Sequence, residues 1–550
     1  MPSCSAKARI KIRFRFISAS LFPSDKIMAA TSEALAVSSE TSAGPPGTRT
    51  QEKNSYGEIV KSSMLVGGSS VLNIAIAIFR TKAMALLLGP SGFGLFGLYG
   101  SVADLTQSVA GLGVNSSGVR QIAESVGSGD DGQIARTAAV LRRTSIVLGS
   151  MGAAFLLLGS RLVSRVTFGN TKETFAISLL SIVVFFRLIS AGQGALIQGT
   201  RRIAALAKMS VLGALFGVFT SIPLVYFFRE KGVVPSLISV AAMTILTSWW
   251  YSRNIAVQKV VVTWLQIRNE TWSLLKLGSV FMASGFMTMG VAYLVRIMVL
   301  RNLGIGATGL YQSAWGLGGF YVGIILQAMG ADFYPRLTAS INNHDESNRL
   351  VNEQTLVGLL VAGPGVLATL TFAPLVIALL YSGRFGAAVS VLRWICLGAT
   401  LQVISWPMGF ISVAKGRQSI FFLSELAWTI VAVALALFCV KRYGLEGAGI
   451  AFFCSYVFHA VLTYPIAIYL TGFRWSTTNR HHLLLFSIAI GLVFAGFYVM
   501  PTLWASGIGS VAAVAAAIYS FKALVHLIPP SHLPNPLKRL LVGVSRPSES

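Results

Sequence analysis

The chain has 550 residues, of which 54% are hydrophobic and only 11% charged, and its formal net charge is +25. Soluble domains carry about 25% charged residues, so this composition excludes an ordinary soluble protein. Apolar stretches of about 20 residues, the length that crosses a bilayer, recur along the sequence and predict an all-α polytopic membrane protein. The positive charge does not indicate a nucleic-acid partner, because no RNA-binding or helix-turn-helix pattern accompanies it.

Residues 1–56 are polar and basic near their start, and we predict a disordered cytoplasmic tail there. Hydropathy then predicts about fourteen membrane helices. They are expected at 60–86, 94–114, 144–164, 176–198, 209–228, 233–252, 278–301, 308–330, 355–379, 388–412, 419–439, 447–470, 482–501 and 505–527. The loops on one side are richer in Lys and Arg, so this side, which both termini share, is expected to be cytoplasmic.

One glycine motif occurs twice in the chain. Gly92–Ser101 and Gly304–Ser313 both fit G-x-G-x-x-G-L-Y-x-S at an offset of about 212 positions. A dinucleotide site would need a strand before the motif, whereas each copy lies between apolar runs. We therefore interpret the glycines as a tight turn with close backbone approach between membrane helices. The motif glycines are Gly92, Gly94, Gly97, Gly304, Gly306 and Gly309, and Gly232 aligns with Gly444 at the same offset.

This duplication predicts two parallel six-helix lobes that are related by a pseudo-twofold axis along the membrane normal. The expected N-lobe covers 57–253, an interlobe linker covers 254–277, and the C-lobe covers 278–470. Residues 471–550 then add two further helices and a cytoplasmic tail.

Charged side chains inside the predicted helices are the candidate site residues, because such charges are costly in a membrane. Arg187 lies near the middle of its helix, too far from either end for its side chain to snorkel. Arg80, Lys82 and Arg296 also interrupt apolar helices, although each would snorkel if its helix ended earlier than drawn. The excess of positive charge predicts an anionic ligand, and the planar fork of arginine suits a phosphate best.

Asp104 has two interpretations: it neutralises Arg80, Lys82 or Arg187, or it couples transport to a proton or sodium gradient. No cofactor or metal site is predicted, because the 4 cysteines and 6 histidines show no ligand spacing. No catalytic motif such as GxSxG or HExxH occurs, and every expected external loop is short. We therefore predict that the chain is not an enzyme.

Three segments resemble a known family, namely Lys82–Gly94, Tyr334–Leu337 and Gly444–Gly449. They are similar to the O-antigen translocases, which are Wzx-type polysaccharide flippases of the multidrug/oligosaccharidyl-lipid/polysaccharide (MOP) exporter superfamily. The resemblance covers residues 57–470 and implies the MATE-like fold of that superfamily.

The resemblance implies a flippase in the bacterial inner membrane that carries an undecaprenyl-diphosphate-linked oligosaccharide, such as an O-antigen unit of lipopolysaccharide, from the cytoplasmic to the periplasmic leaflet. It implies that the diphosphate meets Arg80, Lys82, Arg187 and Arg296 in a central cavity during alternating access. A polysaccharide polymerase and chain-length proteins are expected as further partners. A lipid II flippase of the same superfamily and a membrane enzyme of glycan assembly remain as alternatives. An exporter of cationic drugs is disfavoured, because it would need an acidic cavity.

Overall fold

The computed structural model describes residues 49–128, 131–253, 255 and 264–527. Most of the predicted tail 1–56 and the first part of the predicted linker 254–277 lie outside the described residues. The chain divides into two units, residues 1–68 and 69–550, and the description below concerns the second unit.

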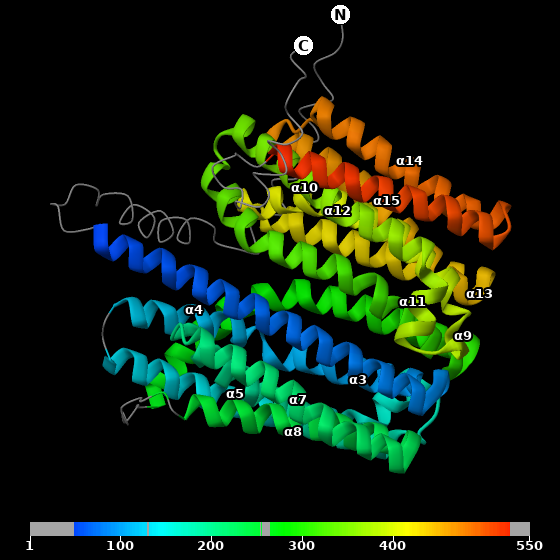
Figure 1. Cartoon of the computed structure of the whole chain (residues 1–550). Helices are drawn as coiled ribbons and strands as arrows, with labels where there is room; N and C mark the ends of the chain where they lie inside the picture. Colours follow the sequence, from blue (N-terminus) through cyan, green and yellow to red (C-terminus); the bar gives the residue numbers. More distant parts are fainter. Residues whose placement is uncertain (1–48, 129–130, 254, 256–263, 528–550) are drawn as a thin grey trace, which may run out of the picture. The chain divides into compact units, whose positions relative to one another are not determined.

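All regular secondary structure of the described residues is helical, as the composition predicts. The helices, labelled as in Figure 1, are α3 (Arg49–Gly111), α4 (Val114–Gly127), α5 (Asp131–Phe168), α6 (Thr174–Gly199), α7 (Ile203–Phe228), η1 (Arg229–Gly232), α8 (Val233–Ser252), α9 (Trp264–Ser340), α10 (His344–Thr371), α11 (Ala373–Leu380), η2 (Gly383–Phe385), α12 (Ala388–Ala414), α13 (Gln418–Thr471), α14 (Thr477–Val499) and α15 (Thr502–Leu527).

In the described part of the chain, 10 helical stretches are long and apolar enough to cross a bilayer. Four of these stretches change direction internally: α3 at Gly89, α9 at Gly304, α13 at Gly444, and the stretch from α7 to α8 at η1. Division at these four points gives fourteen helical segments. The predicted all-α polytopic fold is therefore confirmed, and the chain is a multi-pass membrane protein.

The two halves of the bundle, 69–252 and 264–471, are structurally related, and equivalent residues lie 215 positions apart in the chain. The clearest markers are residues with a left-handed backbone, which occur in the pairs Gly89 (φ 64°) and Gly304 (φ 86°), Arg201 (φ 55°) and Gly416 (φ 68°), and Arg229 (φ 52°) and Gly444 (φ 62°). The hydrogen bond from Arg202 N to Ile197 O recurs between Arg417 N and Ser412 O, at 3.2 and 2.9 Å. These agreements in backbone conformation establish the duplication independently of sequence identity.

The sequence motif suggests an offset of about 212 positions between the two halves. The structure corrects this offset to 215. The counterpart of Gly444 is Arg229 rather than Gly232, because these two residues share the same left-handed conformation. The counterpart of Gly94 is Gly309 rather than Gly306, by the same offset.

The position of the turn within the glycine motif explains this difference of three residues. In the second copy the turn residue is Gly304, the first glycine of the motif, whereas in the first copy it is Gly89, which precedes the motif. Gly92 therefore lies inside a helical segment and does not form the predicted turn. Only the dihedral angles show this, because both copies have a glycine at the motif's first position.

The two halves meet through Gly94 and Gly309. A Cβ added to Gly94 would lie 2.9 Å from Gly309 N, and a Cβ added to Gly309 would lie 2.9 Å from Gly94 N. Gly94 also faces the carbonyl of Ile305, and Gly309 faces the equivalent carbonyl of Pro90. Because equivalent residues contact each other in this reciprocal way only at a twofold axis, the pseudo-axis passes between these two glycines.

The last two helices, α14 and α15, lie outside the duplication. They are side by side against α10 in Figure 1. Leu359 and Leu360 of α10 form an apolar cluster with Phe486 of α14, and α10 leaves room for the ring because Gly363 has no side chain. The pair therefore adds an outer layer to the second half.

Candidate functional site

Three of the four candidate cations lie together around Asp104. Arg80 and Asp104 come from the two segments of α3, Arg187 comes from α6, and Arg296 comes from α9. Arg187 Nη1 is 2.5 Å from Asp104 Oδ1. The charge of Asp104 also acts on Arg296, and the charges of Arg80 and Arg187 repel each other. We call these four residues the arginine cluster.

The ion pair between Arg187 and Asp104 is accessible rather than sealed in the core. Their side chains are 27% and 49% exposed. Of the three possible partners that the sequence leaves for Asp104, the structure places it against Arg187.

Arg296 is fixed more firmly than the other cations. It is only 7% exposed, and its Nε donates a hydrogen bond of 2.6 Å to Gln312 Oε1 while Nη1 donates one of 2.8 Å to Ala292 O. Gln312 itself fits against Gly97, where a Cβ would lie 2.8 Å from its Cγ. The absence of a side chain at Gly97 therefore makes room for the amide that holds Arg296.

Arg80 is the member of the cluster that lacks a polar partner. Its Nε and Nη2 atoms are buried, and within the described residues no acceptor bonds them. The guanidinium lies over the ring of Phe96, with its Cζ 5.4 Å from the centroid. A buried charge without a hydrogen-bond acceptor is costly, so this position is typical of a side chain whose acceptor is supplied by an anionic ligand.

Lys82 does not join the cluster, although it is only two residues from Arg80. Side chains two positions apart on a helix point in different directions. Lys82 is half-buried, and the structure records no hydrogen bond or ion pair for it within the part of the chain that is described. Without Lys82, the cluster of three arginines and one carboxylate still has a net positive charge. The arginines offer several N–H donors to an oxyanion.

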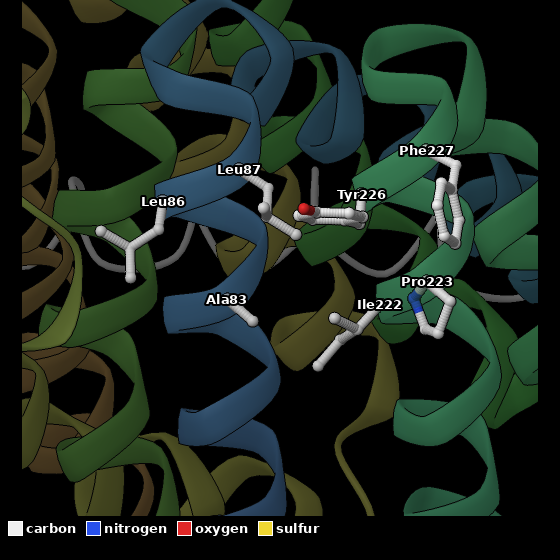
Figure 2. A pocket seen from close by; sticks show the side chains of 7 residues that line it. All are labelled: Ala83, Leu86, Leu87, Ile222, Pro223, Tyr226 and Phe227. Carbon is white, nitrogen blue, oxygen red and sulfur yellow. The ribbon is translucent and has the colours of Figure 1, made fainter.

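An apolar groove begins one helical turn beyond Arg80. Figure 2 shows Ala83, Leu86 and Leu87 of α3 on one side of it. The opposite side is formed by α7 residues Ile222, Pro223, Tyr226 and Phe227, and the groove has a volume of about 440 Å³. No cation lines this groove, so it can accept hydrocarbon but not phosphate.

Arg301 links the two halves near the turn side of the bundle. Its Nη2 donates to the carbonyls of Arg165 and Val166, at 2.5 and 2.7 Å, and its Nε donates to Thr167 O at 3.1 Å. Arg301 of α9 therefore caps the C-terminal end of α5, where free carbonyls favour a cation.

The chain is similar in sequence to known proteins. A family model described as "Polysaccharide biosynthesis protein" matches residues 83–390. The chain is 25% identical over 422 residues to a Shigella flexneri protein named "Putative O-antigen transporter", with 74% of this chain and 96% of that protein covered. It is 22% identical over 408 residues to the "Lipid III flippase" of Escherichia coli (strain K12), with 72% and 95% covered.

Solved structures show the same fold. The structure titled "Lipid II flippase MurJ, inward closed conformation" has a TM-score of 0.60 and 15% identity, and covers 85% of this chain and 100% of that chain. An inward-facing multidrug resistance MATE family transporter of the MOP superfamily also has a TM-score of 0.60, with 17% identity and coverage of 73% and 99%. The predicted resemblance to polysaccharide transporters is confirmed by the family model and the two relatives, and the MATE-like fold that it implies is confirmed by these structures.

Proposed function

The chain belongs to the polysaccharide biosynthesis protein family, and from this premise we propose that it is a flippase for lipid-linked oligosaccharides. The proposed cargo is an undecaprenyl-diphosphate-linked O-antigen or related polysaccharide unit. We propose that it moves from the cytoplasmic to the periplasmic leaflet of the bacterial inner membrane, with both protein termini in the cytoplasm. The two relatives named as an O-antigen transporter and a lipid III flippase support transport rather than catalysis.

The observation that carries the proposal is the unpartnered guanidinium of Arg80 beside Arg187. A diphosphate brings several oxygen acceptors into this cluster, and each bond to a guanidinium is charge-assisted. An exporter of cationic drugs would need the opposite charge at this place. The apolar groove one helical turn from Arg80 supports a cargo with a hydrocarbon chain, because head and tail would meet matching surfaces.

Alternating access would act on the contact between the halves. Gly94 and Gly309 close one side of the bundle in the structure described here. We propose that the cargo enters the arginine cluster from the opposite side, and that separation of the two glycines then opens the exit. The negative charge of a bound diphosphate would reduce the repulsion between Arg80 and Arg187. Binding would therefore change the electrostatic interaction between α3 and α6, which carry these two residues.

The test uses the full chain in proteoliposomes with undecaprenyl diphosphate that carries a fluorescent disaccharide. The wild-type protein is expected to expose the label to an external quencher without any change in the mass of the lipid. Arg80→Gln removes a charged donor, which is worth about 1.5–3 kcal/mol, so we expect flipping to slow by about tenfold to a hundredfold. Wild-type flipping by this variant would contradict the proposal.

Arg336→Gln is the matched control, because Arg336 lies on the surface and forms its ion pair with Asp332 of the same helix, at 3.1 Å. We expect this variant to flip the lipid at the wild-type rate. A product of higher mass would identify a glycan-assembling enzyme instead. Accumulation of lipid II, rather than another lipid-linked glycan, in depleted cells would identify the lipid II flippase alternative.

A further inference from the structure

A second group of ionisable side chains lies inside the C-terminal half, away from the arginine cluster. Glu425 and His459 come from the two segments of α13, on either side of the turn at Gly444. His459 Nε2 lies 3.8 Å from Glu425 Oε1, and the side chains are only 11% and 18% exposed. Ionisable residues at such depth in a membrane bundle are costly, and they commonly mark pathways for ions or protons.

The imidazole of His459 is held in a defined orientation. Its Nδ1 atom lies 2.9 Å from the hydroxyl of Ser405, which is fully buried in α12. The ring meets Trp428 and Tyr456 edge-on, with centroids 6.2 and 5.9 Å away. Because Nδ1 is engaged by Ser405, the Nε2 atom remains for Glu425, and a proton can be exchanged there.

Other ionisable groups near the pair are few. Tyr456 is a further titratable residue near the pair, and the charge of Glu425 acts on it. From α12 the contacting group is the neutral hydroxyl of Ser405, and from α9 Trp315 contacts Phe452, the neighbour of Tyr456. Within the described residues, the structure records no cation other than His459 paired with Glu425.

We propose that Glu425 and His459 form a proton-binding site that couples flipping to a proton gradient, an inference that rests on the proposed function. With one proton the pair has no net charge, either as carboxylic acid and neutral imidazole or as carboxylate and imidazolium. Loss of this proton leaves a lone carboxylate in the apolar bundle, and gain of a second leaves a lone cation. The closed packing of the helices therefore favours the state with one proton.

The position of the pair gives this proton a mechanical consequence. It joins both segments of α13 to α12 through His459 and Ser405. Deprotonation exposes a charge that water stabilises better than the bundle does, so it favours separation of these segments about the turn at Gly444. A sodium ion fits less well, because hard cations prefer several oxygen ligands and the imidazole supplies nitrogen.

Proton binding is tested first without any cargo. A protonated imidazole quenches a neighbouring indole, so the tryptophan fluorescence of the purified full chain should show a transition with pH. His459→Gln and Trp428→Phe should lose this transition, whereas His526→Gln, in the last turn of α15, should keep it. An unchanged transition in both His459→Gln and Trp428→Phe would overturn the proton site.

Coupling is tested with the fluorescent undecaprenyl-diphosphate disaccharide in proteoliposomes. The ratio of the flipping rate with an imposed pH gradient to the rate without one should rise by up to about tenfold per pH unit for one coupled proton. Glu425→Gln and His459→Gln should bring this ratio to one, and His526→Gln should not. A ratio that stays at the wild-type value in both variants, or that follows sodium instead, would overturn the coupling role.

These two measurements separate the inference from the proposed function. If the wild-type protein moves no lipid while its fluorescence titrates through His459, the flippase proposal fails and the proton site remains.

Discussion

Gly94 and Gly309 occupy equivalent places in the two halves of the molecule and contact each other through main-chain atoms alone. Each presents its bare Cα to the helix that carries the other, so the two helices approach more closely than any side chain would allow. This contact lies on the pseudo-twofold axis. It also closes the bundle on the side where α3 and α9 turn.

A methyl group at this contact should separate the halves. Gly309→Ala places a Cβ against the carbonyl of Pro90, and overpacking of this kind costs about 1–3 kcal/mol. Gly100→Ala is the control in α3, because no atom lies within 4 Å of the added Cβ, and it should be neutral or stabilising. The midpoint of unfolding in detergent measures both variants, and equal midpoints would contradict the close approach.

Two arginines of the cluster should respond oppositely to the same substitution. Arg80→Met removes a buried charge without a polar partner and is expected to stabilise the protein by about 1–3 kcal/mol. Arg296→Met removes the donor to Gln312 and leaves its amide oxygen without this partner, so it should destabilise the protein by about 1–3 kcal/mol. Unfolding midpoints and flipping rates should be measured together, because Arg80→Met is expected to gain stability while it loses transport.

The pair of Arg187 and Asp104 allows the two roles of Asp104 to be separated. Arg187→Ala should abolish glycan delivery while membrane insertion persists. Asp104→Asn should keep the response of flipping to a pH gradient if Asp104 serves only as the partner of Arg187. Loss of that response in Asp104→Asn, with its retention in Glu425→Gln, would transfer the coupling role to Asp104.

The duplicated turns provide a matched test of backbone strain. Arg201 and Gly416 adopt the same left-handed conformation, with φ of 55° and 68°. Gly416→Ala should therefore cost about 1 kcal/mol, since no atom lies within 4 Å of its added Cβ and only the dihedral angle opposes it. Arg201→Gly should lose less stability than Gly416→Ala, or gain stability, because glycine adopts this dihedral angle without strain. The unfolding midpoints of the two variants measure this difference.

Hydropathy was sufficient to predict the membrane helices, because a bilayer imposes one length and one composition on every crossing. The register of the duplication was not predictable to the residue. Both copies carry a glycine at the first position of the motif, and sequence cannot show that the first copy turns at Gly89 instead of Gly92. The equivalence of Arg229 and Gly444 was not predictable for a similar reason. The two residues share a left-handed backbone conformation but not a side chain.

The cations of the site were found individually from their positions in apolar helices, but their partners were not. Pairing depends on the rotation of each helix about its axis, which places Arg187 against Asp104 and turns Lys82 away from Arg80. The pair of Glu425 and His459 was missed altogether, since a turn at Gly444 separates them in the chain. A helical period does not extend across such a turn.

The glycine contact has a consequence for the proposed transport. If the halves part there, as proposed, the carbonyls of Pro90 and Ile305 would be uncovered. Main-chain oxygens accept hydrogen bonds from any sugar hydroxyl, whatever its stereochemistry. Contacts of a glycan with these two carbonyls would therefore not discriminate among sugars of different structure.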